Sequence, residues 1–261
     1  MNENVKLLNR KLYPKRTINI PKNYYSNLSC YEDFVIRTNL LGYDVSDDEL
    51  YDCIIGEDNI HEVYGNFYFF AVDNGTSRHL CIIDRKGNRI ENAVIEGDFD
   101  CSSMDLTSLE GGPSEVGGKF YCYTNNLTSL EGGPREVGGD FCCSYNNLTS
   151  LVGGPGKVGG SFYCPVNNLT SLEGSPIKVG GGFYCLDNHL TSLEGSPIEV
   201  GGDFNCFKNN LTSLEGAPIK VGGAFDCSKN NLTSNQVQAY KKWLKTNPSG
   251  SYNDAFCSIG I

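Results

Sequence analysis

The sequence has few of the side chains on which catalytic and metal sites usually depend. Its 261 residues include three histidines, two methionines and one tryptophan, and only 20% of them are charged. Basic residues are fewer than acidic ones, 21 against 31, so the net charge is -10. A general nucleic-acid-binding surface is basic, so direct binding of nucleic acid is not expected, whereas a basic or mixed protein surface suits this chain as a partner.

Segments that would cross a membrane or direct secretion are also missing. No window approaches the ~18 consecutive apolar residues of a membrane-spanning helix. The start, MNENVKLLNRKLYPKRT, lacks the apolar stretch and the small-residue cleavage site of a secretory signal. We therefore expect a protein of the reducing cytoplasm, with no membrane partner, in which the cysteines remain free thiols.

Motifs for nucleotide binding and nucleophilic catalysis are absent as well. There is no phosphate-loop GxxxxGK[ST], no GxGxxG after a strand and no GxSxG. Cys53, His61, His79 and Cys81 can be imagined around a zinc ion, but their spacing matches no common structural site. The sequence therefore predicts no catalytic residue, no metal site and no cofactor.

Glycine and cysteine are abundant instead, with 31 and 12 residues, and an internal repeat explains both. From about Ile95 to Thr233 the sequence recurs every 21 residues, and one unit reads LTSLEGGPSEVGGKFYCYTNN. The recurring phenylalanine and cysteine positions are Phe99, Phe120, Phe141, Phe162, Phe183, Phe204 and Phe225, and Cys101, Cys122, Cys143, Cys164, Cys185, Cys206 and Cys227.

The pattern F-x-C, bounded by Gly-Gly and Asn-Asn, predicts one very short strand per unit with Phe and Cys pointing inward. The remainder, L-T-S-L-E-G-G-P-x-x-V-G-G, contains too many helix breakers for a helix, so an extended or turn-like return path is expected. Such units bury their apolar side chains only by stacking, with strands ~4.8 Å apart in a parallel ladder. The repeated asparagine, Asn125 in this unit, is expected inside the coil, where its amide satisfies backbone groups of the turn.

The frame F-x-C-x-x-N-N-L-T-S-L resembles the leucine-rich repeat signature L-x-L-x-x-N-x-L-x-x-L, with Phe120, Cys122, Asn125, Leu127 and Leu130 at its fixed positions. The continuation L-T-S-L-E-G-G-P-x-x-V is similar to the short bacterial class, and near-identical units resemble arrays in bacteriophage and prophage proteins. The resemblance covers about 140 of 261 residues. It implies a leucine-rich-repeat solenoid, with a parallel β-sheet of about seven short strands on a concave, partner-binding side and an irregular convex side. Phe and Cys in place of the strand leucines, the added Gly-Gly and the 21-residue length depart from the pattern and bear on the curvature.

Two flanking segments, residues 1–92 and 234–261, enclose the repeats at residues 93–233. The first is expected to be an α+β capping domain with helices near Tyr31–Leu41 and from Ser46, followed by a meander of the strands VYGNFYFFAV, SRHLCIID and NRIENAVIE. The second begins with SNQVQAYKKWLKTNPSG, an amphipathic helix expected to start at Ser234 and to cover the last coil.

Seven of the twelve cysteines occupy one repeated position, where they are expected to be small buried hydrophobes. Cys142, beside Cys143, must point the other way, so we expect it to be the reactive thiol. The roles of the five cysteines outside the repeated position, Cys30, Cys53, Cys81, Cys142 and Cys257, stay open.

Strand alternation assigns the residues beside the inward Phe and Cys to an exposed face. Variation concentrates at these positions, whereas the rest of the unit is nearly invariant within the chain. Exposed aromatics beside acids are typical of a protein-binding hot spot, although strand-favouring tyrosines also simply suit a sheet. The predicted partner-binding residues are Tyr121, Tyr123, Tyr145, Tyr163, Tyr184, Leu186 and Phe207, rimmed by Asp98, Asp100, Asp140, Asp203 and Asp226.

These observations favour a non-catalytic interaction protein. The resemblance to phage arrays implies a bacterial host protein as the partner, met in the host cytoplasm and inhibited or redirected by binding, for example a defence protein. Two other hypotheses remain. One is an enzyme with its activity in residues 1–92 and the repeats as a targeting module, and the other is a sponge for a small or nucleotide-like ligand, against which the acidic rim counts.

Overall fold

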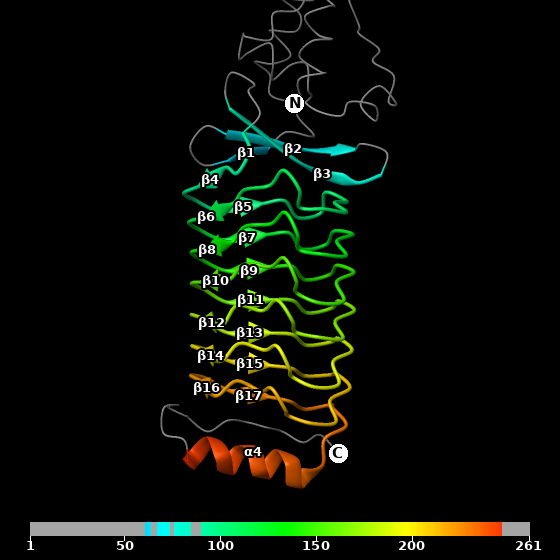
Figure 1. The fold of residues 1–261 in the computed structure, drawn as a ribbon, viewed down its shortest axis with the longest axis vertical. Coiled ribbons are helices and arrows are strands. Elements are labelled where there is room, and N and C mark those ends of the chain that lie inside the picture. The colour runs from blue at the N-terminus through cyan, green and yellow to red at the C-terminus, as the bar shows by residue number, and fades with distance from the viewer. Residues whose placement is uncertain (1–60, 64–66, 74–75, 85–89, 247–261) are drawn as a thin grey trace, which may run out of the picture.

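The protein is a parallel β-solenoid in which successive coils stack into a column (Figure 1). The computed structural model describes residues 61–63, 67–73, 76–84 and 90–246. The two helices expected near Tyr31–Leu41 and from Ser46 lie outside these residues.

Each coil contributes two strands of two residues, and the strands form two parallel seven-stranded sheets. The valine sheet consists of β4 (Val94–Ile95), β6 (Glu115–Val116), β8 (Glu136–Val137), β10 (Lys157–Val158), β12 (Lys178–Val179), β14 (Glu199–Val200) and β16 (Lys220–Val221). The phenylalanine sheet consists of β5 (Phe99–Asp100), β7 (Phe120–Tyr121), β9 (Phe141–Cys142), β11 (Phe162–Tyr163), β13 (Phe183–Tyr184), β15 (Phe204–Asn205) and β17 (Phe225–Asp226). In both sheets each strand pairs with the equivalent strand of every adjacent coil, so the inner strands have two partners and the end strands one.

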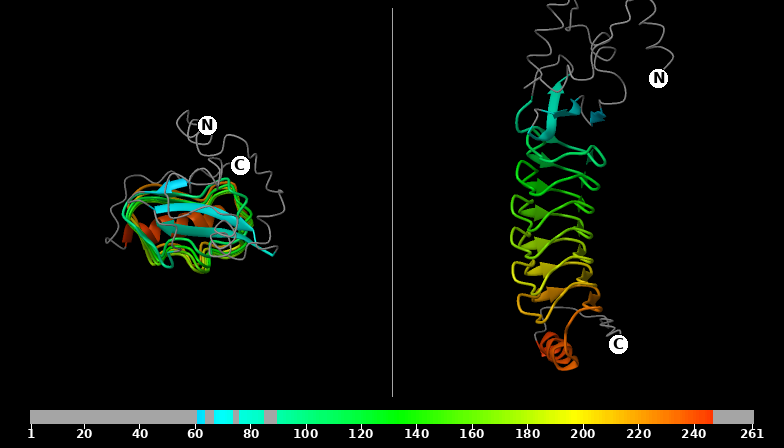
Figure 2. Two further views of the ribbon diagram at one scale, coloured as in Figure 1. Left: turned by 90° about the horizontal axis from the view of Figure 1, so that it is seen from above. Right: turned by 90° about the vertical axis from the view of Figure 1, so that its right-hand side faces the viewer.

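The valine sheet was not expected, because a single sheet was predicted. The rest of each coil, such as residues 122–135, contains no strand, as expected of the return path. From β6 onward the strands of the valine sheet pair an outward Glu or Lys with an inward Val, and β4 pairs Val94 with an inward Ile95. Two residues are too few for a period-2 pattern to stand out in the sequence. The expected concave face is also wrong, because the coils stack as a straight column in both side views (Figures 1 and 2). Strands with the same ~4.8 Å spacing on two sides of the coil leave no difference in thickness that would bend the stack.

The inward orientation of Phe and Cys is confirmed. The seven phenylalanines of the column are 0–2% exposed and the seven cysteines 0–3%. Consecutive Phe rings lie 4.9–5.7 Å apart between centroids, so the column forms a continuous aromatic core along the solenoid.

The asparagine column has the predicted structural role. Asn146 Oδ1 accepts a hydrogen bond from the Leu127 amide at 3.0 Å, and Asn146 Nδ2 donates to the carbonyls of Cys122 at 3.0 Å and Cys143 at 3.2 Å. One side chain therefore bonds backbone groups of its own coil and of the preceding coil. The same arrangement recurs at Asn125, Asn167, Asn188, Asn209 and Asn230.

A three-stranded antiparallel sheet lies against the N-terminal end of the column (Figure 1). It consists of β1 (His61–Val63), β2 (Phe67–Asp73) and β3 (Arg78–Asp84). The Phe69 ring lies 4.4 Å from that of Phe99, and the Leu80 amide donates to the Glu110 carbonyl at 3.0 Å. The segment NRIENAVIE was expected to be a strand that leads into the first coil. Of its described residues only Val94–Ile95 form a strand, and this strand, β4, belongs to the valine sheet.

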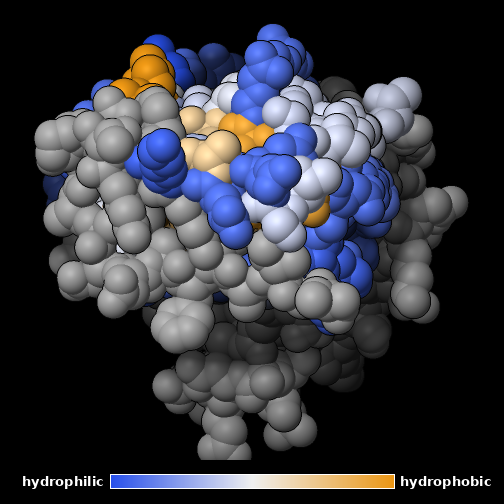
Figure 3. Space-filling model, turned by 90° about the horizontal axis from the view of Figure 1, so that it is seen from below, coloured by the Kyte–Doolittle hydropathy of each residue, from blue (hydrophilic) through white to orange (hydrophobic). Residues whose placement is uncertain are grey.

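The helix α4 (Ser234–Thr246) covers the other end and begins at the predicted residue. Thr233 and Gln236 cap it reciprocally, since Gln236 Oε1 accepts from the Thr233 amide at 2.8 Å and Thr233 Oγ1 accepts from the Gln236 amide at 3.4 Å. Tyr240 packs its ring 4.8 Å from Phe225 and donates its hydroxyl to the Pro218 carbonyl at 2.8 Å. Seen from this end (Figure 3), the described surface is mostly hydrophilic with small apolar patches.

Candidate functional site

The tyrosine face is the outward side of the phenylalanine sheet and its adjoining turn. We define it by the predicted residues Tyr121, Tyr123, Tyr145, Tyr163, Tyr184, Leu186 and Phe207, all of which are exposed or half-buried. The register places Tyr121, Cys142, Tyr163 and Tyr184 side by side on consecutive strands. The structure therefore brings the predicted apolar residues together on coils that are contiguous in the stack.

Tyr163 and Tyr184 form the most ordered part of this face. Their rings are stacked with centroids 4.8 Å apart and an interplanar angle of 4°. A Cβ added to Gly182 would lie 2.6 Å from the Tyr184 ring, so the absence of a side chain there makes room for that ring. Partial burial raises the pKa of the Tyr184 hydroxyl, and the nearby Asp203 carboxylate and Tyr163 raise it further.

Tyr121 lies in a mixed aromatic and charged environment. Its ring meets Tyr123 edge-on, with centroids 6.1 Å apart. Lys119 Nζ lies 6.0 Å from the centroid of the Tyr121 ring and 3.4 Å from Asp140 Oδ2 on the next coil. Hydrogen bonding to Tyr121 and Asp140 raises the pKa of the Lys119 ammonium.

The outer margin of the face lies along the turn that follows the strands. Tyr145 is 58% exposed and Tyr123 37%, the largest values on the face. Tyr145 has a φ of 54°, in the left-handed region, as have the residues at this position in the other coils. Phe207 makes a cation–π contact with Lys229, whose Nζ lies 5.3 Å from the ring centroid.

The five rim aspartates lie at the predicted edge of the face, but each also bonds the backbone. Asp98, Asp140 and Asp203 accept through Oδ1 from the amide of the equivalent residue of the next coil, at 2.7–2.8 Å. Asp100 accepts from the Ser102 amide at 3.0 Å, and Asp226 from the Ser228 amide at 2.9 Å. Sequence reasoning missed this role, although an Asp directly after Gly-Gly in two of the coils, at Asp140 and Asp203, was the available signal.

A second apolar row, beside the valine sheet, was not predicted. Ile177, Ile198 and Ile219 follow the repeated proline in three consecutive coils and are 72%, 48% and 49% exposed. Ion pairs run across the neighbouring strands, from Lys178 and Lys220 to Glu199 at 3.2 and 3.9 Å. The repeated Pro-Ile pair was the sequence signal for this row.

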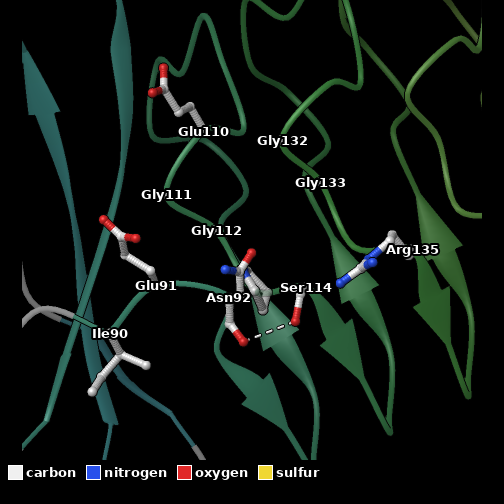
Figure 4. Close-up of a pocket in the computed structure, with 11 residues that line it drawn as sticks. Ile90, Glu91, Asn92, Glu110, Gly111, Gly112, Ser114, Gly132, Gly133 and Arg135 are labelled. Carbon is white, nitrogen blue, oxygen red and sulfur yellow. Dashed lines mark hydrogen bonds between the residues drawn. The ribbon is translucent and has the colours of Figure 1, made fainter.

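A hollow of about 540 Å³ lies near the N-terminal cap, where the turns of the first coils meet residues 90–92 (Figure 4). Glycines of two turns line it, and Glu91 and Arg135 stand on opposite sides. Ser114 also lines the hollow, and its Oγ donates a hydrogen bond to the Asn92 carbonyl at 2.9 Å. That bond ties Ser114 to the backbone of the preceding coil, a structural role for this hydroxyl.

The thiols divide as the alternation predicted. Burial raises the pKa of Cys122, Cys143 and Cys164 well above the ordinary value. Cys142 is partly exposed, and its Sγ lies 3.2 Å from Ser144 Oγ. Within the described ranges, no three His, Cys, Asp or Glu side chains gather in a way that could hold a metal ion. Of the imagined zinc set, Cys53 lies outside those ranges.

The part of the chain that the structure describes contains no helix that is both long enough and apolar enough to span a membrane. No protein-family model matches the sequence, and no curated protein matches it either.

Proposed function

We propose that the protein is a non-catalytic binding module that engages another protein through the tyrosine face. The observation that carries the proposal is the concentration of seven aromatic or aliphatic side chains, none of them buried, on one face of a sheet whose own core is closed. Tyrosine is enriched at the energetic centres of protein interfaces, because its large ring buries much area and its hydroxyl retains a hydrogen bond.

The rigidity of the sheet supports this proposal. Tyr121, Tyr163 and Tyr184 stand on strands that pair with both neighbouring coils, and the rings of Tyr163 and Tyr184 are already stacked. A face held in place before binding loses little conformational entropy when a partner docks. Flatness further suits a partner with a broad surface rather than a small ligand, which usually occupies a concave pocket.

The charge of the rim supports a partner with a basic or mixed surface. Asp98, Asp100 and Asp203 are exposed, and each uses one carboxylate oxygen for a backbone amide. Their negative charge remains on this side of the molecule, where it steers basic surfaces toward the tyrosine face.

The class of partner is inferred from the repeat sequence. The repeat frame resembles leucine-rich repeats of the short bacterial class and arrays of bacteriophage proteins. We therefore propose a phage-type leucine-rich-repeat protein that acts in the host cytoplasm, where it binds a host protein such as a defence factor and inhibits or redirects it. This step is supported by resemblance alone.

The test is capture from bacterial lysate, with bound proteins identified by mass spectrometry. The variant carries Tyr121→Ala, Tyr163→Ala and Tyr184→Ala, and the matched control carries Ile177→Ala, Ile198→Ala and Ile219→Ala, which remove as many apolar side chains from the other row. The tyrosine variant should lose the captured protein, with an affinity at least about 100-fold weaker. Unchanged binding by a folded tyrosine variant, or loss in the isoleucine variant instead, would refute the proposal.

A further inference from the structure

The row of residues that follows the column phenylalanines has a gap in its aromatic side chains. Tyr121, Cys142 and Tyr163 occupy consecutive strands in register, so Cys142 is flanked by a tyrosine on each side. Tyr163 and Tyr184 show how two neighbouring rings of this row stack, with centroids 4.8 Å apart. Positions two strands apart are separated by about 9.6 Å, twice the strand spacing, which leaves room for one planar group between two rings.

The floor of this gap is small and polar. Cys142 is partly exposed, and its Sγ contacts Ser144 Oγ at 3.2 Å. Ser144 is itself 6% exposed, so neither side chain stands up between the flanking tyrosines. The position of the missing ring is therefore lined by short side chains and remains open to a partner.

Charge selects which planar group fits. The Lys119 ammonium already lies beside this gap, 6.0 Å from the Tyr121 ring centroid and 3.4 Å from Asp140 Oδ2. Asp100, on the preceding strand β5, and Asp98, in the turn before that strand, each accept a backbone amide and form no ion pair within the described residues. Three carboxylates against one ammonium leave this end of the face acidic, and an aromatic ring stabilises a cation over its face.

We propose that the gap between Tyr121 and Tyr163, above Cys142, receives the guanidinium of an arginine presented by the partner protein. Guanidinium is planar, stacks on aromatic faces and is more weakly hydrated than an ammonium, whereas lysine lacks the flat shape that the gap requires. The inference rests on the proposed function and names the side chain that the tyrosine face recognises.

Three variants separate this site from the rest of the face. Cys142→Tyr supplies the missing ring and closes the gap, whereas Cys142→Ser keeps it open. Asn205→Tyr is the matched control, because it adds the same ring in the same row but beyond Tyr184, outside the gap. Far-UV circular dichroism and a thermal unfolding curve establish that each variant is folded.

The probes are two blocked tripeptides, acetyl-Gly-Arg-Gly-amide and acetyl-Gly-Lys-Gly-amide, titrated into tyrosine-labelled protein and followed by NMR. The arginine peptide should shift the ring signals of Tyr121 and Tyr163 while leaving Tyr145 unmoved, and should bind about fivefold more tightly than the lysine peptide. Cys142→Tyr should abolish this preference, and Cys142→Ser and Asn205→Tyr should retain it.

The inference is overturned if both peptides bind the wild-type protein equally, or if Cys142→Tyr keeps the preference. Tighter binding of acetyl-Gly-Phe-Gly-amide than of the arginine peptide would also overturn it, because the occupant would then be aromatic. The two proposals fail separately. A captured partner that survives the triple tyrosine substitution refutes the proposed function, whereas one that is lost there but binds Cys142→Tyr normally refutes only the arginine site.

Discussion

Replacing Asn146 with alanine should destabilise the protein by about 2 kcal/mol. Asn146 forms four hydrogen bonds to backbone groups, but they are not equally replaceable. The Ser144 carbonyl also accepts from the Thr124 amide at 3.0 Å. The Cys122 carbonyl also accepts from Asn125 Nδ2 at 3.1 Å, and the Cys143 carbonyl from Asn167 Nδ2 at 3.1 Å. The Leu127 amide has no other acceptor among the described residues. The cost is therefore mainly that of one unsatisfied buried amide, which is about 1–3 kcal/mol.

Urea unfolding followed by circular dichroism measures this difference, with Asn147→Ala as the control. Asn147 is the adjacent residue of the same Asn-Asn pair, and it is exposed rather than buried. Its replacement should change the free energy of unfolding by no more than about 0.5 kcal/mol. Equal effects at the two positions, or no effect at Asn146, would show that the side-chain amide does not hold the coils together as the hydrogen bonds indicate.

Burial of the cysteine column should make stability fall at alkaline pH. The buried Cys122, Cys143 and Cys164 keep their protons above about pH 8.5, where thiols of the unfolded chain release them. The unfolding free energy should drop by about 1.4 kcal/mol per pH unit for each such thiol, and Cys143→Ala should flatten this dependence. The midpoints of urea unfolding at about pH 7.5 and about pH 10 measure this pH dependence, and equal midpoints at the two pH values would contradict the prediction. Val166 is β-branched with a φ of 54°, so Val166→Asn should stabilise the protein by about 0.5–1 kcal/mol, whereas Val166→Thr should not. Thermal unfolding of the two variants tests this prediction, and a Val166→Asn variant no more stable than the wild type would contradict it. A Cβ at Gly138 would overlap the Gly117 carbonyl oxygen, whereas at Gly156 its nearest neighbour is 4.0 Å away. Gly138→Ala should therefore cost more than about 2 kcal/mol and Gly156→Ala should be neutral or slightly stabilising. Urea unfolding of the two variants measures this difference, and similar unfolding midpoints for Gly138→Ala and Gly156→Ala would contradict the prediction.

Much of the frame was predictable because the same local pattern recurs every 21 residues. A single F-x-C triplet is a weak strand signal, but its repetition identified Phe120 and Cys122 as inward and Tyr121 as outward. The Asn125 interior position followed from the need to satisfy turn backbone groups, and the hydrogen bonds confirm it. The valine sheet escaped prediction because a pair such as Glu136–Val137 is too short to display alternation.

The candidate site was predicted only as a set of outward positions. Sequence alternation placed the tyrosines on one face, but it could not show that Tyr163 and Tyr184 stack, because ring orientation depends on the neighbouring coil. The same limit applies to the rim. Asp98 was expected to face solvent, yet it also bonds the Lys119 amide 21 residues further along the chain.

By itself, the sequence determined the repeat length, the inward columns, the asparagine ladder and the terminal helix from Ser234. These follow from side-chain chemistry and from alternation within a single unit. Only the tertiary structure decided the second sheet, the straight column and the stacking of Tyr163 on Tyr184. These features depend on how one coil lies against the next, where residues 21 positions apart become neighbours, and no local pattern encodes the resulting shape.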